Sequence, residues 1–225
     1  MTALHSSRPR RYDLIVFDWD GTLFDSTALI VRCIQAACRD LEVTVPSDEA
    51  AAYVIGLGLH DALQHAVPGL PAARYPELGL RYRHHYFREQ HEVTLFTGVT
   101  NLLQALRQRH HWLAVATGKS RRGLDEALRS SSLGDLFDAT RTADETASKP
   151  HPLMLLELMA EFGVDAHRTL MIGDTTHDLQ LATNAGADSV AVAYGAHEPA
   201  QLAGHEPLLV AQSVAELQQW LLAHA

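Results

Sequence analysis

The sequence predicts an α/β protein, in which a doubly wound parallel sheet carries a small α-helical domain inserted after its first strand. Three observations predict it. Several short apolar runs are continuous rather than alternating, as in strands that are buried on both faces. Helix-like stretches separate most of these runs, and such alternation is typical of parallel α/β folds. One long segment, from about Ser26 to Val93, holds helical patterns and no convincing strand.

The predicted strands are short apolar runs: Tyr12–Phe17, Trp112–Ala116, Thr169–Ile172, Ser189–Tyr194 and Pro207–Ala211. In a parallel sheet with helices on both sides, side chains that point up and side chains that point down are both buried. The continuous pattern therefore favours a parallel sheet that is covered on both faces.

Helical patterns lie between the predicted strands, at Val99–Arg109, Arg121–Ser130, Leu153–Phe162 and Asp178–Asn184. Gly186 follows the last of these and is a plausible stop signal. Near the C-terminus, Ser213 and Glu216 have the spacing of a capping box, ahead of an amphipathic helix that runs toward Leu222. Strands and helices that alternate at these lengths predict a Rossmann-like, doubly wound core.

The segment from residue 26 to residue 93 is predicted to be a helical cap domain. Its helical patterns cover Ala28–Leu41, Ser47–Ile55 and Ala72–Gln90, with glycines and prolines between them. The core would then comprise residues 12–25 and 94–225. The glycine-rich turn Ile55–His60 has two interpretations of equal weight. It folds over a site and excludes water on closure, or it is an ordinary turn between helices.

Charge and hydropathy argue against two classes of partner. A formal net charge of -9 argues against general nucleic-acid binding, which needs a basic surface. No apolar run approaches the ~20 residues of a membrane-spanning helix, so we expect no membrane partner. A small anionic substrate remains open, because a few local cations and a metal ion can overcome an acidic surface. A monomer and a homodimer fit the sequence equally well.

The cysteines and the N-terminus favour a cytoplasmic location. Cys33 and Cys38 lie five residues apart in one helical pattern and so face different directions, which argues against a disulfide. A reducing compartment fits this usage. Residues Met1–Arg11 are polar and basic, and no apolar h-region follows them as in a secretory signal. We expect a partly disordered arm there.

Lysine is rare in this chain. Of the 18 Lys and Arg residues, only Lys119 and Lys149 are lysines, which indicates a general bias toward arginine. Arginine therefore serves wherever a generic positive charge is sufficient. The two remaining lysines are worth inspecting, because a compact ammonium can approach a single oxygen in a way that a guanidinium cannot.

Two carboxylates directly follow the first predicted strand. Asp18 and Asp20 come first, and Gly21 and Thr22 come next. Ligands of open α/β sheets bind beyond the carboxyl ends of the strands, so both acids lie where a substrate would bind. A divalent cation would relieve the charge of the first acid, and proton transfer suits the second. The alternative is an Asp-Gly turn with both acids in solvent.

More polar residues follow the second and third predicted strands. Thr117 and Gly118 follow the second, where a hydroxyl and neighbouring backbone N–H groups can bind a phosphate oxygen. Lys149 precedes a predicted helix and could reach the same edge of the sheet. Asp174 and Asp178 follow the third strand and supply two more carboxylates. Such a gathering of acids, a hydroxyl and a lysine is hard to explain as packing.

The order of these motifs resembles the haloacid dehalogenase superfamily of hydrolases. The motifs are Asp-x-Asp-Gly-Thr at 18–22, Thr-Gly at 117–118, Lys-Pro at 149–150 and Gly-Asp-x-x-x-Asp at 173–178. Each motif alone is common, but the combination is specific. The helical segment after the first motif is similar to the C1-type cap of the branch that includes the phosphoglycolate phosphatases. The resemblance covers nearly the whole chain beyond residue 11.

The resemblance implies a phosphatase that acts on a small phosphorylated metabolite. Asp18 would attack phosphorus to form an aspartyl-phosphate, while Asp20 would protonate the leaving oxygen and then activate water. Thr117 and Gly118 would bind the transferring phosphoryl group. Lys149 would neutralise that group and orient Asp18.

The resemblance also implies a Mg²⁺ ion. Its ligands would be Asp18, the backbone carbonyl of Asp20 and Asp174, and Asp178 would support the coordination shell. The metal would screen the charge of Asp18 against an anionic substrate, which would otherwise oppose the attack.

Four residues near the motifs are given less prominent roles. We expect Lys119 to lie on the surface at a helix start, with a contribution to phosphate affinity as the alternative. Trp19 is expected to pack against a neighbouring element rather than shape the site. For His151 and His177, contact with the substrate is the less favoured alternative.

Two other functions remain open. A phosphosugar mutase shares the aspartyl-phosphate but returns the phosphoryl group to its substrate, whereas a phosphatase loses it to water. A non-catalytic module that binds a phosphorylated metabolite or a protein would be favoured by a missing nucleophile or metal-binding acid, and neither is missing. Phosphonate-cleaving relatives use a cap lysine, and residues 26–93 contain none.

Overall fold

The structure is a computed structural model, and it describes residues 11–225. The arm predicted at the N-terminus lies outside the described residues, except for Arg11. A six-stranded sheet has the order β3-β2-β1-β4-β5-β6, and every neighbouring pair is parallel. The strands are β1 (Leu14–Phe17), β2 (Trp112–Thr117), β3 (Ala139–Thr142), β4 (Thr169–Gly173), β5 (Asp188–Val192) and β6 (Val210–Ala211).

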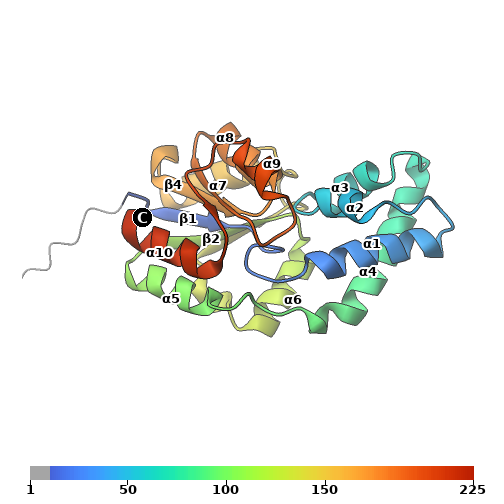
Figure 1. Cartoon of the computed structure of the whole chain (residues 1–225), viewed down its shortest axis with the longest axis horizontal. Coiled ribbons are helices and arrows are strands. Elements are labelled where there is room, and N and C mark those ends of the chain that lie inside the picture. Colours follow the sequence, from blue (N-terminus) through green and yellow to red (C-terminus); the bar gives the residue numbers. More distant parts are fainter. Residues whose placement is uncertain (1–10) are drawn as a thin grey trace, which may run out of the picture.

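Helices cover both faces of this sheet, so the predicted doubly wound fold is confirmed (Figure 1). One hydrophobic cluster joins the sheet to α5, α6 and α10, and a second joins the opposite face to α7 and α8. The short helix α9 packs beside α8. The bounds are α5 (Val99–Gln108), α6 (Arg121–Ser131), α7 (Leu153–Phe162), α8 (Thr176–Ala185), α9 (Pro199–Ala203) and α10 (Val214–His224).

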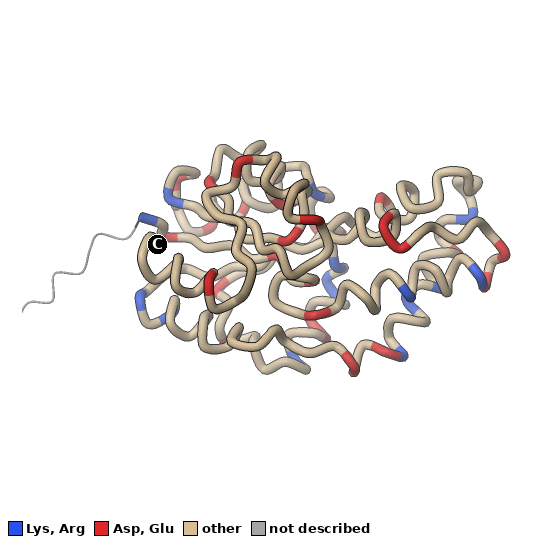
Figure 2. Tube along the Cα trace, in the orientation of Figure 1, with Lys and Arg blue, Asp and Glu red and all other residues tan. Residues whose placement is uncertain are grey.

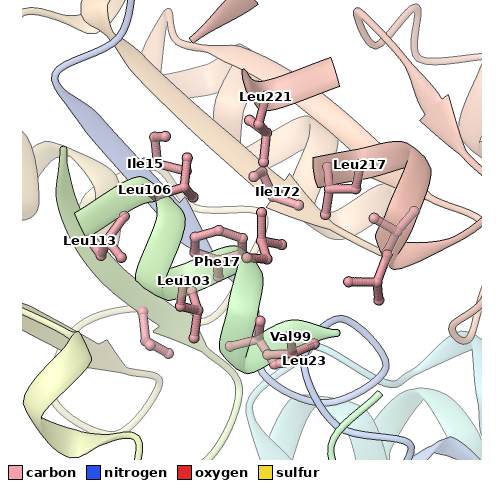
Figure 3. Packing of buried hydrophobic residues seen from close by; sticks show 14 of the residues in the cluster. Ile15, Phe17, Leu23, Val99, Leu103, Leu106, Leu113, Ile172, Leu217 and Leu221 are labelled. Atoms are coloured by element: carbon pink, nitrogen blue, oxygen red, sulfur yellow. The ribbon is translucent and has the colours of Figure 1, made fainter. Parts of the chain in front are cut away.

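The central strand β1 explains why its apolar run is continuous. Ile15 and Phe17 belong to the cluster formed with α5 and α10, whereas Leu14 and Val16 belong to the cluster formed with α7 and α8. Figure 3 shows Phe17 among side chains of α5 and near those of α10. All four residues of β1 are fully buried. Burial on both faces selects apolar side chains at successive positions and removes the alternation of a half-exposed strand.

Four of the five α-helices between β1 and β2 pack around a hydrophobic cluster of their own. We call these helices, with their connecting loops, the helical lobe. Figure 1 shows the lobe beyond one end of the strands. The absence of strands in this segment confirms that part of the prediction, whereas domain boundaries at residues 26 and 93 stay a prediction. The helices are α1 (Thr27–Asp40), α2 (Asp48–Tyr53), α3 (Leu59–Ala66) and α4 (Tyr75–Glu89).

Three elements were not predicted, for physical reasons that differ. Strand β3 lies at the sheet edge and has the sequence ATRT, so it lacks an apolar run. Helix α9 spans only five residues, too few for a periodic pattern to stand out. Helix α3 begins at Leu59, inside the stretch that was interpreted as a glycine-rich turn. The run at Pro207–Ala211 was predicted too long, because strand β6 spans only Val210–Ala211, although Leu208 and Leu209 also form backbone hydrogen bonds with β5.

Two further sequence predictions are tested by the fold. Cys33 and Cys38 are both buried and free, as expected. The capping box before α10 is only half formed: the Ser213 hydroxyl accepts from the Glu216 N–H, but the Glu216 carboxylate accepts from Gln212 instead. No helix among the described residues is long and apolar enough to cross a membrane. Acidic and basic residues are interspersed over the sheet layers and the helical lobe (Figure 2).

Candidate active site

The motif residues gather at the carboxyl ends of three neighbouring strands. β1 pairs with β2 on one side and with β4 on the other, so Phe17 lies level with Val115 and Ile172. Asp18 therefore leaves the sheet between the ends of two other strands. In a parallel sheet these ends share one edge, which is where such folds bind ligands. The topology alone brings Asp18, Thr117 and Asp174 together.

Lys149 lies between two buried carboxylates. Its Nζ is 2.7 Å from Oδ1 of Asp18 and 2.6 Å from Oδ1 of Asp178, and all three side chains are at most 1% exposed. Burial raises the pKa of Asp18 to about 7, although the ammonium of Lys149 opposes this rise. Burial lowers the pKa of Lys149, but the two carboxylates outweigh it and leave that pKa above its ordinary value.

Asp174 is held by hydrogen bonds and by close-packed glycines. Its Oδ1 accepts from the Thr22 hydroxyl at 2.7 Å, and its Oδ2 accepts from the Ala196 N–H at 2.8 Å. A Cβ at Gly21 would lie 2.1 Å from Oδ2, and one at Gly195 would lie 2.3 Å from it. Burial, and then Asp18 and Asp178, raise the pKa of Asp174 well above its ordinary value. The fold thus holds Asp174 in a buried position, where an ionised carboxylate without a cation beside it is unfavourable.

Asp178 has a structural role at the start of α8 that its position in the motif does not reveal. It closes a capping box at the start of α8, because its Oδ2 accepts from the N–H of Thr175 at 3.1 Å and from the Thr175 hydroxyl at 2.7 Å. Its Oδ1 accepts from Lys149. Oδ2 therefore accepts two hydrogen bonds and Oδ1 pairs with Lys149, whereas each oxygen of Asp174 accepts one hydrogen bond. This fuller engagement suits the supporting role expected for Asp178 better than that of a direct metal ligand.

The three acids fit a divalent cation. Asp18, Asp174 and Asp178 each offer an oxygen, and these oxygens lie within 4.8 Å of one another. Among the described residues, no hydrogen-bond donor reaches the buried Oδ2 of Asp18. A buried carboxylate oxygen without a partner is costly, and three acids beside one lysine leave an excess of negative charge. Oxygen ligands of this kind are those that Mg²⁺ takes in proteins.

Asp20, which lines the same pocket as Asp18, has both carboxylate oxygens engaged. Oδ1 accepts from the Ser26 hydroxyl at 2.7 Å, and Oδ2 is 3.0 Å from Nζ of Lys119. The expected surface role of Lys119 is wrong. Its side chain is only 10% exposed, and its Nζ also donates to the hydroxyl of Tyr86 in α4 at 2.9 Å. Burial lowers the pKa of Lys119, but Asp20 and then Tyr86 raise it above its ordinary value.

Thr117 and Gly118 line a pocket of about 100 Å³ between the core and the helical lobe, together with Asp18 and Asp20. The Thr117 hydroxyl accepts from the backbone N–H of Lys119 at 3.2 Å. The lobe supplies mainly apolar side chains, and Arg83 is the one cation among its lining residues. A phosphoryl group that enters this pocket would meet the Thr117 hydroxyl, the ammonium of Lys119 and the nucleophile candidate Asp18 together.

The glycine-rich turn of the lobe lies directly on the core. The N–H of Gly58 donates to the Ser148 hydroxyl at 2.8 Å, and Ile55, Gly56 and Leu57 line the pocket. The turn therefore lies against the core and lines the pocket, as the first interpretation expects, whereas the exclusion of water on closure stays a prediction. A second contact between lobe and core involves the carbonyl of Tyr53, which accepts hydrogen bonds from His177 and His197.

Three residues singled out by sequence lie away from the pocket. Trp19 is 1% exposed and stacks on Phe24 with 4.8 Å between ring centroids, so the predicted packing role is confirmed. His151 and His177 do not line the pocket, in line with the favoured interpretation. His177 instead bonds the Tyr53 carbonyl at 2.8 Å, and burial lowers its pKa. His197, which bonds the same carbonyl at 3.0 Å, was missed because it lies in no motif.

Comparison with known proteins gives a consistent result. The family model for haloacid dehalogenase-like hydrolases matches residues 15–192. The probable phosphatase IndB of Dickeya dadantii (strain 3937) is 35% identical over 91% of this chain and 91% of its own length. A 5'-nucleotidase of Pseudomonas aeruginosa is 32% identical over 95% of this chain and 97% of its own.

A solved structure extends the similarity to three dimensions. The crystal structure of a predicted phosphoglycolate phosphatase from Haemophilus somnus 129pt has a TM-score of 0.83 and 25% identity. The alignment covers 93% of this chain and 97% of that one, and it therefore includes both the sheet and the helical lobe.

Proposed function

The chain belongs to the haloacid dehalogenase-like hydrolases and is a phosphatase of that family, and we propose that it hydrolyses small phosphomonoesters through an aspartyl-phosphate on Asp18. The observation that carries the proposal is the environment of Asp18. It lines the pocket, Lys149 lies 2.7 Å from one of its oxygens, and its other oxygen has no hydrogen-bond donor among the described residues. A carboxylate held in this way is oriented, and one of its oxygens is not engaged by any hydrogen-bond donor among the described residues.

The first step would be attack by a carboxylate oxygen of Asp18 on phosphorus. The new O–P bond forms as the ester P–O bond breaks, and Asp20, which enters this step protonated, gives its proton to the departing oxygen and becomes a carboxylate. Thr117 would donate its hydroxyl to a phosphoryl oxygen, because that hydroxyl accepts from the backbone and has its proton available. Lys149 would hold Asp18 in line and balance the charge at the reacting centre.

The second step would return the enzyme to its starting state. Asp20 accepts a proton from water, and the resulting hydroxide attacks the phosphorus of the aspartyl-phosphate. The bond between phosphorus and Asp18 then breaks, which releases inorganic phosphate and restores the carboxylate. Asp20 lies beside Asp18 on the pocket wall, so one residue can serve the protons of both steps.

We propose Mg²⁺ as the cofactor. Asp18, the backbone carbonyl of Asp20 and Asp174 would hold it, with Asp178 fixed behind them by Thr175 and Lys149. When bound, the ion would reduce the repulsion between the Asp18 carboxylate and a phosphate dianion.

The substrate would be a small phosphorylated metabolite, and the helical lobe would act as a cap over it. A pocket of about 100 Å³ limits what fits while the lobe lies in this position. The structurally similar predicted phosphoglycolate phosphatase and the related 5'-nucleotidase suggest two substrate classes to test first. The location would be cytoplasmic, the state a monomer or homodimer, and neither nucleic acid nor membrane would be a partner.

The test is phosphate release from a panel that includes phosphoglycolate, sugar phosphates and 5'-nucleotides, with Mg²⁺ or with a chelator. We expect sustained release that needs Mg²⁺ and that is lost in Asp18→Asn. Full activity of Asp18→Asn would refute the nucleophile. Isomerisation of a sugar phosphate without net phosphate release would instead identify a mutase, and tight binding without turnover would identify a non-catalytic module.

A further inference from the structure

Lys119 makes two polar contacts that come from different parts of the molecule. Asp20 belongs to the loop after β1, whereas Tyr86 belongs to α4 of the helical lobe. Lys119 itself follows β2 in the core. Its ammonium therefore forms a bridge from the lobe to Asp20, with distances of 2.9 and 3.0 Å. Only two lysines occur in the chain, and the other one, Lys149, contacts Asp18 in a similar way.

The orientation of Asp20 depends on this bridge. A carboxylate turns freely about its side-chain torsions unless both oxygens are held. Ser26 holds Oδ1 and Lys119 holds Oδ2. Lysine has a flexible four-carbon stem, so a single contact to Asp20 would not fix its ammonium. The hydrogen bond to Tyr86 supplies the second anchor.

The lobe also determines how strong the ion pair is. The side chains of Lys119 and Asp20 are only 10% and 12% exposed. Their pocket is lined on one side by residues of the lobe. If the lobe moved away, Tyr86 would leave with α4, and the pair would be exposed to water. Exposed pairs of this kind contribute little, because solvent and salt screen them.

We propose that Lys119 is a positioning residue that joins Tyr86 to Asp20 and so presents Asp20 to the leaving group only while the helical lobe lies over the sheet. The inference rests on the proposed function, because it assumes that Asp20 protonates the leaving oxygen. The inference gives Lys119 a functional role, which none of the four motifs assigns to it. It also gives α4 a part in the chemistry, although none of its residues belongs to a motif.

The test compares two substrates that differ in their need for an acid. Departure of an alkoxide from glycerol phosphate needs a proton, whereas 4-nitrophenolate leaves without one. The parameter is kcat/KM, because it reports only the steps up to departure of the leaving group. We expect Lys119→Met to lower kcat/KM for glycerol phosphate about tenfold or more and that for 4-nitrophenyl phosphate less than about threefold.

Two more variants test the link to the lobe. Tyr86→Phe removes only the hydroxyl, and we expect a smaller loss with the same substrate dependence. In the Lys119→Met background, Tyr86→Phe should have no further effect, because the two residues act through one contact. Arg122→Met is the matched control: it removes a different core–lobe contact, in which the guanidinium lies 5.7 Å from the ring centroid of Phe87, and should change neither substrate.

Each other outcome overturns the inference in a recognisable way. An equal loss for both substrates in Lys119→Met would make Lys119 a phosphate-binding residue, and no loss would leave it without a role. Asp20→Asn separates the two proposals. If Asp20→Asn shows the substrate dependence and neither Lys119→Met nor Tyr86→Phe does, the inference fails and the proposed function stands. If Asp20→Asn shows none, the acid role fails and the inference fails with it.

Discussion

Gly118 of the core lies so close to Leu57 of the helical lobe that a Cβ on the glycine would be 2.3 Å from the Leu57 carbonyl oxygen. The carbonyl oxygen of Gly56 would be 2.6 Å from the same Cβ. Real side chains do not approach backbone oxygens this closely. The absence of a side chain at position 118 is therefore a condition for the turn of the lobe to lie beside the pocket.

We predict that Gly118→Ala lowers kcat/KM by about tenfold or more, because a shift of about 1 Å in an active site can cost up to 100-fold. The melting temperature should change little, because the lobe keeps its own hydrophobic cluster. Steady-state kinetics and thermal melts check both parts. The control is Gly134→Ala, where a Cβ would meet nothing within 4 Å. Kinetics of Gly118→Ala within twofold of wild type would contradict the prediction.

The fold was predictable where burial imposes one kind of residue at every position. β1 is such a case, since its four side chains divide between two clusters. β3 was not predictable, because Thr140 and Arg141 make polar contacts to Arg121 and Glu157 at the sheet edge. A strand with these side chains has no pattern that separates it from a loop.

The candidate site likewise contains residues whose positions were predictable from the sequence and one whose environment was not. Asp18 and Asp174 were predictable because each follows an apolar strand, and parallel strands bring such residues to one edge. The environment of Lys119 was not predictable, because Tyr86 lies 33 residues away on a helix of the lobe. The only sequence signal was the rarity of lysine, and it applied equally to Lys119 and Lys149. The rarity of lysine singled out both residues, but only Lys149 lies in a motif, so the sequence favoured a role for Lys149 alone.

Stability without metal should fall as the pH rises toward neutrality. Burial raises the native pKa of Asp18 to about 7, so between roughly pH 4 and 7 the native state holds a proton that the unfolded chain has lost. The free energy of unfolding then falls by about 1.4 kcal/mol per pH unit within that window and levels off above it. The raised pKa of Asp174 acts in the same direction.

The measurement is thermal unfolding from pH 5 to pH 8 in a chelator, for wild type and for Asp18→Asn. Other carboxylates titrate in both proteins, so the informative quantity is the difference between them. We expect Asp18→Asn to gain stability relative to wild type as the pH rises. A difference that does not vary with pH would contradict the raised pKa of Asp18.

Mg²⁺ should stabilise the folded protein. A ligand that binds only the native state adds about 2.7 kcal/mol at 100 times its dissociation constant. We expect this increase in wild type at pH 7 and its loss in Asp174→Asn, because Asp174 is one of the three acids that gather there. Glu49→Gln, which changes an exposed carboxylate of α2, is the control and should keep the increase. Equal stabilisation of wild type and Asp174→Asn would place the ion elsewhere.

His197 should have two separable effects, because its two ring nitrogens serve different partners. Nδ1 accepts from the N–H of Thr176 at the start of α8, and Nε2 donates to the carbonyl of Tyr53 in the lobe. An unsatisfied buried N–H costs about 1–3 kcal/mol. Asparagine can replace Nδ1 but does not reach Tyr53. Glutamine can replace Nε2, and its amide extends past Thr176.

We therefore predict that His197→Asn keeps the melting temperature and loosens the lobe, whereas His197→Gln lowers the melting temperature and keeps the lobe docked. Hydrogen exchange in α2, which ends at Tyr53, measures docking, and thermal melts measure stability. His177 donates to the same carbonyl, so the loss of docking in His197→Asn should be partial. If both variants changed both quantities equally, the two contacts would be parts of one cooperative unit, and the docking of the lobe could not be separated from the start of α8.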